Sequence, residues 1–213
     1  MADTGFNSPG TMATVGRLDD EPWADPDNAK TSNNTYTTNA TLKNDLSDYL
    51  RATNFTMGVP AGATIDGIEV EVERKTDVGQ FPVDDEVFLR KTTTGQVGSN
   101  YASATKWPTS DATETYGGAA DKWGTTWSAA DVNHADFGLD FAFLAEGDDA
   151  LGSVDHVQIK VYYTAAGPSG TNTQINIGDA WKAISAAQIN IGDAWKAVAG
   201  MQINIGDTWK TIF

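Results

Sequence analysis

The 213-residue chain contains no cysteine, which excludes disulfide frameworks, thiolate nucleophiles and cysteine-based zinc sites. Basic residues are scarce, with 14 lysines and arginines against 29 aspartates and glutamates and a net charge of −15 when both histidines are neutral. A chain this acidic repels phosphate backbones, so we expect no nucleic-acid partner. The longest apolar run, Phe141–Ala145, is far shorter than the roughly 20 residues of a membrane-spanning helix, so we expect no membrane insertion.

Catalytic signatures are also missing. The sequence contains no G-x-S-x-G, G-x-x-x-x-G-K, G-x-G-x-x-G or H-E-x-x-H motif. The two histidines, His134 and His156, lie in no recognisable motif, so we expect structural or surface roles for them. We therefore expect a non-enzymatic protein with no cofactor.

The sequence from about residue 15 to 164 shows repeated strand patterns. Apolar residues alternate with polar ones in Ile65–Arg74, where Ile68, Val70 and Val72 alternate with glutamates. Similar alternation predicts strands over 137–143, 157–163, 86–90 and 50–57, with turns at 59–62 and 116–118 and a single helical turn at 128–132. Six to nine short strands separated by turns indicate an all-β fold, an antiparallel, jelly-roll-like β-sandwich.

Composition divides the chain into four parts. Residues 165–173 are small and polar, with glycine, proline and serine, and predict a linker. Residues 1–164 carry 26 acidic and 11 basic residues, whereas 165–213 carry three of each. We expect a flexible arm over 1–14, the sandwich over 15–164, the linker over 165–173 and a repeat region over 174–213.

The repeat region contains three copies of one motif. Gln174–Lys182 recurs unchanged as Gln188–Lys196, and again as Gln202–Lys210 with Thr208 in place of alanine. The 14-residue spacing predicts one β-hairpin per copy (174–187, 188–201 and 202–213), with Gly-Asp in a type II′ turn. A two-residue turn would place Ile177 opposite Ala180, Asn176 opposite Trp181 and Ile175 opposite Lys182. A three-residue loop would instead bring Trp181 onto the isoleucine face.

In the two-residue register, both faces of each hairpin carry large apolar residues, which a lone hairpin cannot bury. The copies should therefore pack together, either as a prism within one chain or as an intertwined homotrimer, which we favour because symmetry leaves no open sheet edge. The residues expected to form this contact are Ile175, Ile177, Trp181, Ile184, Ile189, Ile191, Trp195, Val198, Ile203, Ile205, Trp209 and Ile212.

Two kinds of ligand site deserve testing in the sandwich. Clustered acids could supply oxygen ligands to a structural Ca²⁺, although solvated acidic loops are the commoner case. Four tryptophans could form sugar-stacking platforms, although core positions are the commoner role. The calcium candidates are Asp25, Asp27, Asp84, Asp85, Asp148 and Asp149, and the tryptophans are Trp23, Trp107, Trp123 and Trp127.

The Asn-Ile-Gly-Asp-x-Trp-Lys units resemble short repeats found near the ends of phage and prophage virion proteins, in which the aspartate is often a second glycine. The body also resembles a β-sandwich module of tailed-phage structural proteins, in stretches such as 55–60, 65–68, 121–124 and 154–163. The resemblance implies a head fibre, tail fibre or decoration protein, usually trimeric, located on the virion. Its partners would be itself, other capsid or tail proteins and a host-surface glycan, and it implies no catalytic residue.

An alternative is a carbohydrate-binding module of a secreted or tail-associated protein, which requires a groove with coplanar aromatic rings. A glycan-degrading enzyme of the tailspike kind would require an acid pair in a cleft. Both alternatives require a specific site in the sandwich, either an aromatic groove or an acid pair in a cleft, whereas the fibre hypothesis does not.

Overall fold

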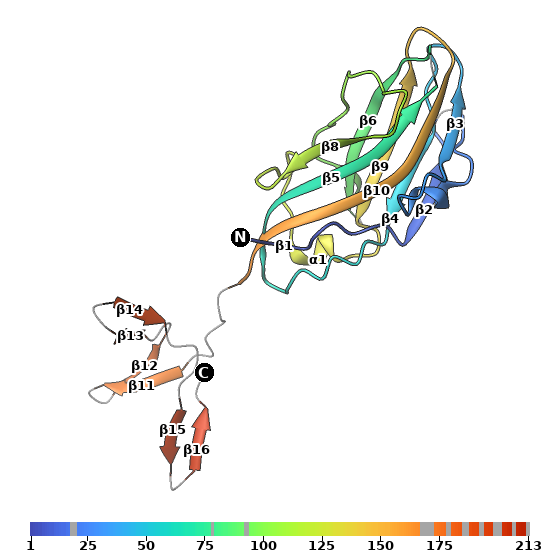
Figure 1. Ribbon diagram of the computed structural model, residues 1–213. Helices are drawn as coiled ribbons and strands as arrows, with labels where there is room; N and C mark the ends of the chain where they lie inside the picture. Colours follow the sequence, from blue (N-terminus) through green and yellow to red (C-terminus); the bar gives the residue numbers. More distant parts are fainter. Residues whose placement is uncertain are drawn as a thin grey trace. The chain divides into compact units, whose positions relative to one another are not determined.

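The computed structural model describes residues 1–17, 21–77, 79–91 and 94–166, and six short strands between 173 and 211. The chain divides into two compact units, Met1–Ala165 and Ala166–Phe213. The division falls within the stretch expected to be the linker. The first unit is an antiparallel β-sandwich, as the strand patterns predict (Figure 1).

Sheet A is built on two long strands, β5 (Thr64–Thr76) and β10 (Ala150–Thr164), which pair along almost their whole length. The strand order is β1-β10-β5-β8, and β3 also pairs with β10. The remaining strands of this sheet are β1 (Ala2–Asp3), β3 (Thr37–Thr41) and β8 (Ala112–Gly118).

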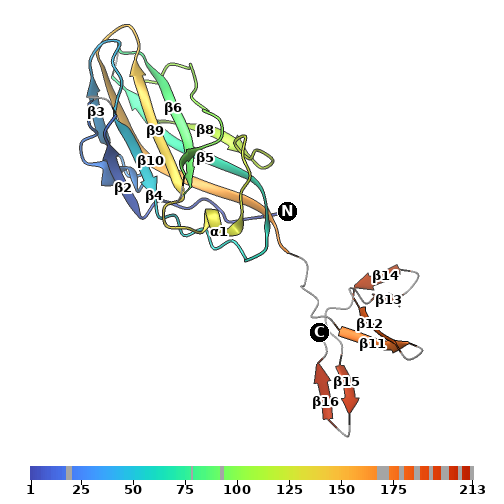
Figure 2. The same cartoon turned by 180° about the vertical axis from the view of Figure 1, so that it is seen from behind.

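Sheet B has the strand order β2-β4-β9-β6-β7, and all of its pairs are antiparallel. Figure 2 shows this sheet in front, with β9 and β6 running side by side. Its strands are β2 (Thr11–Val15), β4 (Tyr49–Thr53), β6 (Pro82–Lys91), β7 (Gly95–Val97) and β9 (Gly138–Ala145).

Helical structure in the described residues is limited to two single turns, η1 (Pro26–Ala29) and α1 (Ala129–Val132). The turn expected at 128–132 is confirmed, and a capping box begins it, since the Ser128 hydroxyl accepts from the Asp131 amide while the Asp131 carboxylate accepts from the Ser128 amide. Neither turn approaches the length and apolar character that a membrane-crossing helix requires.

The core lies between the two sheets. Val70 and Val72 of β5 and Ile159 of β10 are fully buried, and so are Phe141 and Phe143 of β9. The outer face of β5 carries the charged residues Glu69, Glu71 and Glu73, as the alternation predicts, and the outer face of β10 carries polar residues such as Gln158 and Lys160. Burying each large apolar side chain stabilises the fold by about 1.5–3 kcal/mol relative to exposure.

The four tryptophans considered as sugar platforms belong to this core. Trp23, Trp107 and Trp123 are at most 3% exposed, and Trp127 is 9% exposed. Trp107 packs on Phe143 with ring centroids 5.1 Å apart, and Trp127 meets Phe137 edge-on at 5.5 Å. The core role is confirmed for all four, and the platform role is wrong.

Three local predictions need correction. Residues 1–14 are not a free arm, because Ala2 pairs with Tyr163 in sheet A and Thr11 pairs with Thr53 in sheet B. The strand expected over 50–57 ends at Thr53, since Asn54 adopts a left-handed conformation with φ of 61°. The turn expected at 116–118 is the end of β8, where a Cβ on Gly117 would lie 2.4 Å from the indole nitrogen of Trp123. Glycine is favoured there by its φ of 71° and by the close approach of Trp123, not by a reversal of the chain.

In the second unit, each described pair of strands forms its own two-stranded antiparallel sheet. Ile177 is paired with Ala180, Asn176 with Trp181 and Ile175 with Lys182, which is the register expected for a two-residue turn, and the other two copies repeat it. The Gly-Asp turns, Val198 and Ile212 lie outside the described residues. The strands are β11 (Thr173–Ile177), β12 (Ala180–Ile184), β13 (Gln188–Ile191), β14 (Ala194–Ala197), β15 (Gln202–Ile205) and β16 (Thr208–Thr211).

Candidate functional site

The outer face of sheet B has small residues along its middle strand. There β9 contributes Gly138, Asp140 and Ala142, which alternate with the buried phenylalanines and leucine of the inner face. A Cβ on Gly138 would lie 1.8 Å from the backbone oxygen of Ala52, so only glycine allows β4 to approach this closely. Larger side chains on β4 and β6 stand on both sides of this row, and the face is hollowed between them.

The hollow, which we call the sheet B depression, has a volume of about 490 Å³. Two smaller depressions, of about 330 and 270 Å³, lie beside α1 and carry no charged side chain. The sheet B depression is therefore the better candidate for binding a polar ligand. Its lining consists of Val15, Gly16, Tyr49, Arg51, Arg90, Thr94, Gly95, Gln96 and Asp140.

Two arginines converge on one buried carboxylate in this depression. Arg51 donates from Nε and Nη2 to the two oxygens of Asp140, at 2.7 and 3.0 Å, and Nη1 of Arg90 reaches both oxygens at 3.2 Å. The Asp140 side chain is 1% exposed, whereas those of Arg51 and Arg90 are 28% and 13% exposed. A buried carboxylate is costly unless it is paired, so separating either arginine from Asp140 would be unfavourable. Asp140 therefore holds the two guanidinium groups in place.

The positions of these residues follow from strand register. Arg51 on β4 is directly paired with Asp140 on β9, and Arg90 on β6 is paired with Gly138, the next outward-facing residue of β9. Gln96 on β7 is paired with Arg90 and extends the polar surface toward the sheet edge. Five backbone strands thus hold the site without any long loop, which favours a preformed geometry.

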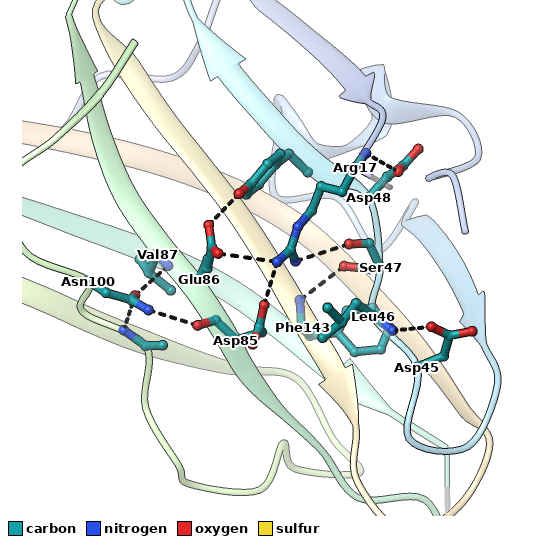
Figure 3. A network of polar contacts seen from close by, with 12 residues as sticks. Arg17, Asp45, Leu46, Ser47, Asp48, Asp85, Glu86, Val87, Asn100 and Phe143 are labelled. Atoms are coloured by element: carbon teal, nitrogen blue, oxygen red, sulfur yellow. Dashed lines mark hydrogen bonds and ion pairs between the residues drawn. The ribbon is translucent and has the colours of Figure 1, made fainter. Parts of the chain in front are cut away.

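A second arginine network lies next to the depression on the same face (Figure 3). Nη2 of Arg17 lies 2.8 Å from Asp85 and 3.2 Å from Glu86, while its backbone amide donates to Asp48 at 2.8 Å. Burial acts to lower the pKa of Arg17, but the hydrogen bond to Asp85 and the surrounding charges raise it overall. This network joins the end of β2 to β6 across the sheet.

Tyr49 separates the Arg17 network from the depression. Its hydroxyl donates to Glu86, and the Arg17 guanidinium lies 4.7 Å from the centre of its ring. Burial and the hydrogen bond to Glu86 raise the pKa of Tyr49, so it remains a neutral phenol at physiological pH. Its ring gives the lining of the depression an aromatic component beside the two arginines.

The calcium candidates do not assemble into a metal site. Among the described residues, no three acidic or histidine side chains are grouped to hold a metal ion. Asp27 pairs with Lys30 at 2.7 Å, and Asp85 pairs with Arg17. The Asp148 carboxylate accepts from the Asp149 amide and the Asp149 carboxylate accepts from the Lys43 amide. Asp25 takes part in a local turn through its backbone carbonyl, which accepts from the Asn28 amide.

Asp84 is buried in the core rather than available to an ion. Its carboxylate contacts Arg74 and accepts from the Trp107 indole at 2.9 Å and from the Tyr116 hydroxyl at 2.8 Å. Burial lowers the pKa of Arg74, although the neighbouring Tyr116 and Glu114 counteract it. This cluster is a polar link between the sheets in which the Asp84 carboxylate is fully hydrogen-bonded and has no place left for a cation, although Nε of Arg74 is buried without a hydrogen-bond partner.

Both histidines occupy structural positions in the sandwich. His134 is exposed and its Nδ1 accepts from the Asp136 amide at 3.1 Å. His156 on β10 lies 2.8 Å from the Ser8 hydroxyl through Nε2, which fastens the N-terminal segment to sheet A. Burial lowers the pKa of His156, against the charges of Glu73 and Asp155.

The sheet B depression could not be inferred directly from the sequence. Its signal was present, however, in the outward positions of the β9 pattern, where an aspartate lies between glycine and alanine. Only strand pairing could bring arginines 39 residues apart, at positions 51 and 90, to the same carboxylate. The residues expected to join the repeats are spread over the second unit, and their side chains lie outside what the structure describes.

Comparisons with known proteins find similarity at the level of three-dimensional structure alone. No protein-family model matches the sequence, and no curated protein shows significant similarity to it. The structure of a CBM4 carbohydrate-binding module is 13% identical, with 73% of this chain and 93% of that chain covered and a TM-score of 0.37. The CBM22-1 xylan-binding domain of Paenibacillus barcinonensis Xyn10C is 11% identical, with 77% and 97% covered and a TM-score of 0.42.

A third solved structure is the enzymatically active domain of tailspike protein 4 from bacteriophage CBA120. It is 7% identical, has a TM-score of 0.35, and aligns with 72% of this chain but with only 19% of its own chain. At these levels of identity and TM-score, the function of this protein has to be argued from its own residues.

Proposed function

We propose that the protein is a non-enzymatic attachment protein of a tailed-phage virion, located on the particle as a fibre or decoration component. In this proposal the repeats join chains into a homotrimer. The sandwich contacts a glycan of the host surface through the sheet B depression or holds the protein on the capsid or tail. The resemblance of the repeats to those of virion proteins supports the virion location.

The observation that carries this proposal is the pairing of the repeats. Each described hairpin forms hydrogen bonds only between its own two strands, with Asn176 opposite Trp181 in the first copy. An isolated two-stranded hairpin is marginally stable in water. Three such hairpins in tandem, each with apolar residues at alternate positions, are therefore expected to need further copies for burial.

The sheet B depression supports the glycan contact. It is lined by planar hydrogen-bonding groups (Arg51, Arg90 and Gln96) and by the Tyr49 ring. Paired hydroxyls match planar donors, and the apolar face of a sugar ring matches an aromatic side chain. One shallow site of this kind binds weakly, and an oligomer that presents several copies gains avidity without new contacts.

The assembly is tested by removing residues 166–213. The sandwich has its own core and forms a compact unit, so we expect residues 1–165 to remain folded and to become monomeric while the full chain is trimeric. Sedimentation equilibrium gives the mass of each species, and far-UV circular dichroism reports the fold. A full chain that sediments as a monomer would overturn the trimer.

The alternative is a carbohydrate-binding module of a secreted or tail-associated protein. The buried tryptophans cannot form its aromatic platform, so it too must rely on the sheet B depression. Antibody labelling of intact phage particles separates the attachment protein from a secreted module, since only the attachment protein labels the particle.

A further inference from the structure

We infer that the sheet B depression recognises a sugar that carries a carboxylate, such as a uronate, and that Arg51 and Arg90 are the residues that recognise it. This inference rests on the proposed glycan contact and deepens it by naming the class of sugar. It depends on the charge, the hydrogen-bonding capacity and the lining of the depression.

The arginines are distributed unevenly over the molecule. The chain has only four arginines in a sequence of net charge −15, and three of them (Arg17, Arg51 and Arg90) lie on the outer face of sheet B. The fourth, Arg74, is buried with Asp84. Because the rest of the protein is strongly acidic, it would repel an anionic ligand over most of its surface. An anionic ligand can therefore bind only where it contacts guanidinium groups directly, and the sheet B depression is a hollow that provides them.

Within the depression the balance of charge is positive. Its lining contains the two guanidinium groups of Arg51 and Arg90 and the single carboxylate of Asp140, which leaves one positive charge. The carboxylate is also the more deeply buried group, with 1% of its side chain exposed against 28% for Arg51 and 13% for Arg90. A ligand entering the hollow therefore meets the cations before the anion.

Hydrogen-bond donors remain after Asp140 has been satisfied. Arg51 uses Nε and Nη2 on Asp140, and Arg90 uses Nη1 on Asp140 and Nε on the Asp136 carbonyl at 3.3 Å. Among the described residues, Nη1 of Arg51 and Nη2 of Arg90 have no hydrogen-bond partner. Guanidinium donors match a carboxylate, and such charge-assisted bonds are about twice as strong as neutral ones.

The remaining lining fits the rest of a sugar ring. Gln96 and Thr94 can bind hydroxyl groups, and Tyr49 offers an aromatic ring. The volume of about 490 Å³ suits a ligand of one or two sugar units rather than a polypeptide segment. A single net positive charge in the lining balances a monoanionic carboxylate, whereas a phosphate dianion would leave one negative charge uncompensated.

The test compares acidic polysaccharides with their own neutral forms. Alginate, polygalacturonate and hyaluronan are each offered to the full-length protein before and after chemical reduction of their carboxyl groups to alcohols, which keeps every other hydroxyl. Affinity electrophoresis or calorimetry measures the binding. We expect at least one acidic form to bind about tenfold or more tightly than its reduced form, because reduction removes the charge that strengthens the hydrogen bonds to the two arginines.

Variants assign the effect to the depression. Arg51→Gln should lose the preference for the acidic form, and Arg51→Lys should retain part of it, because lysine keeps the charge but not the planar fork. Lys106→Gln is the matched control, since it removes one positive charge from an exposed position outside the depression. Thermal unfolding of each variant verifies that the sandwich is folded, and Arg90→Gln serves if Arg51→Gln does not fold.

The outcomes distinguish this inference from the proposed function. Equal binding of acidic and reduced polysaccharides, weakened by Arg51→Gln, would overturn the carboxylate and leave the glycan contact in place. A preference for the acidic form that Lys106→Gln removes as fully as Arg51→Gln would overturn the assigned residues. Failure of every polysaccharide to bind in either form would count against the glycan contact itself, while the trimer would still be tested separately by sedimentation.

Discussion

The sandwich and the repeats use the same kind of strand in opposite ways. In the sandwich, strands far apart in the sequence are paired, as Ala2 is with Tyr163, and two sheets enclose a shared core. In the repeats, every described pair joins neighbouring strands, and each sheet stops at two strands. The first region carries its stabilising contacts within one chain. The described strands of the second are paired only with their neighbours, and in our proposal this region obtains its core from other copies.

The largest expected contrast comes from removing one tryptophan from each region. Trp123 is fully buried, so Trp123→Ala should lower the free energy of unfolding of the sandwich by about 3–5 kcal/mol. Trp195→Ala should leave the unfolding of residues 1–165 unchanged and weaken the trimer. Calorimetry measures the first effect and sedimentation the second.

These two variants can contradict the comparison directly. If Trp195→Ala lowered the melting temperature of the sandwich as much as Trp123→Ala does, the regions would not be energetically separate. If it changed neither assembly nor unfolding, the tryptophan would not contribute to the contact between chains.

A smaller effect is expected in the polar link between the sheets. Tyr116→Phe removes the hydroxyl that donates to Asp84 at 2.8 Å and leaves the ring in place. Because hydrogen bonds to charged groups contribute about 1.5–3 kcal/mol, we expect a loss of that size in urea unfolding at pH 7. Tyr36→Phe is a suitable control, since its hydroxyl donates to Asp111 at the exposed surface. If both variants lost the same free energy of unfolding, burial of the Asp84 cluster would not strengthen the hydrogen bond of Tyr116.

The smallest effect is a dependence on pH that the two regions should not share. Burial lowers the pKa of His156 below its ordinary value near 6.5, so the folded sandwich binds this proton less readily than the unfolded chain does. The stability contributed by neutral His156 is thus present above about pH 6.5 and is lost as the pH falls through the folded pKa. His156→Gln should flatten this part of the stability profile between pH 7 and 5.

The repeats provide the control for that measurement. Residues 166–213 contain no histidine, so the degree of association should change little between pH 7 and 6. A His156→Gln protein that loses stability with the same pH profile as the parent would exclude His156 as the source.

Strand alternation was sufficient to predict the sandwich and much of its core. Ile68, Val70 and Val72 are buried as the pattern of Ile65–Arg74 indicates, because one buried face imposes a two-residue period. The 14-residue repeat likewise predicted the pairing of Asn176 with Trp181. In both cases the structural information is local in the sequence.

Features that depend on distant pairing could not be predicted in this way. The N-terminal residues appear polar and unstructured as a sequence, and they become strands because β10 and β4 offer them unpaired edges. Asp140 was only one of 29 acidic residues until Arg51 and Arg90 were brought to it by register. The tryptophans were ambiguous for the same reason, since burial depends on which sheet lies opposite.

The position of β10 has a mechanical consequence. The polypeptide leaves the sandwich for the repeats through β10 in sheet A, whereas the depression lies on the outer face of sheet B. If a ligand is held at one and the repeats are pulled at the other, the tension passes from sheet B to sheet A, both through the packed core and along the chain that joins β9 to β10. Because β10 is bonded to β5 over most of its fifteen residues, that load is shared by many backbone bonds, and the rate of forced unfolding rather than equilibrium stability would set how long the tether lasts.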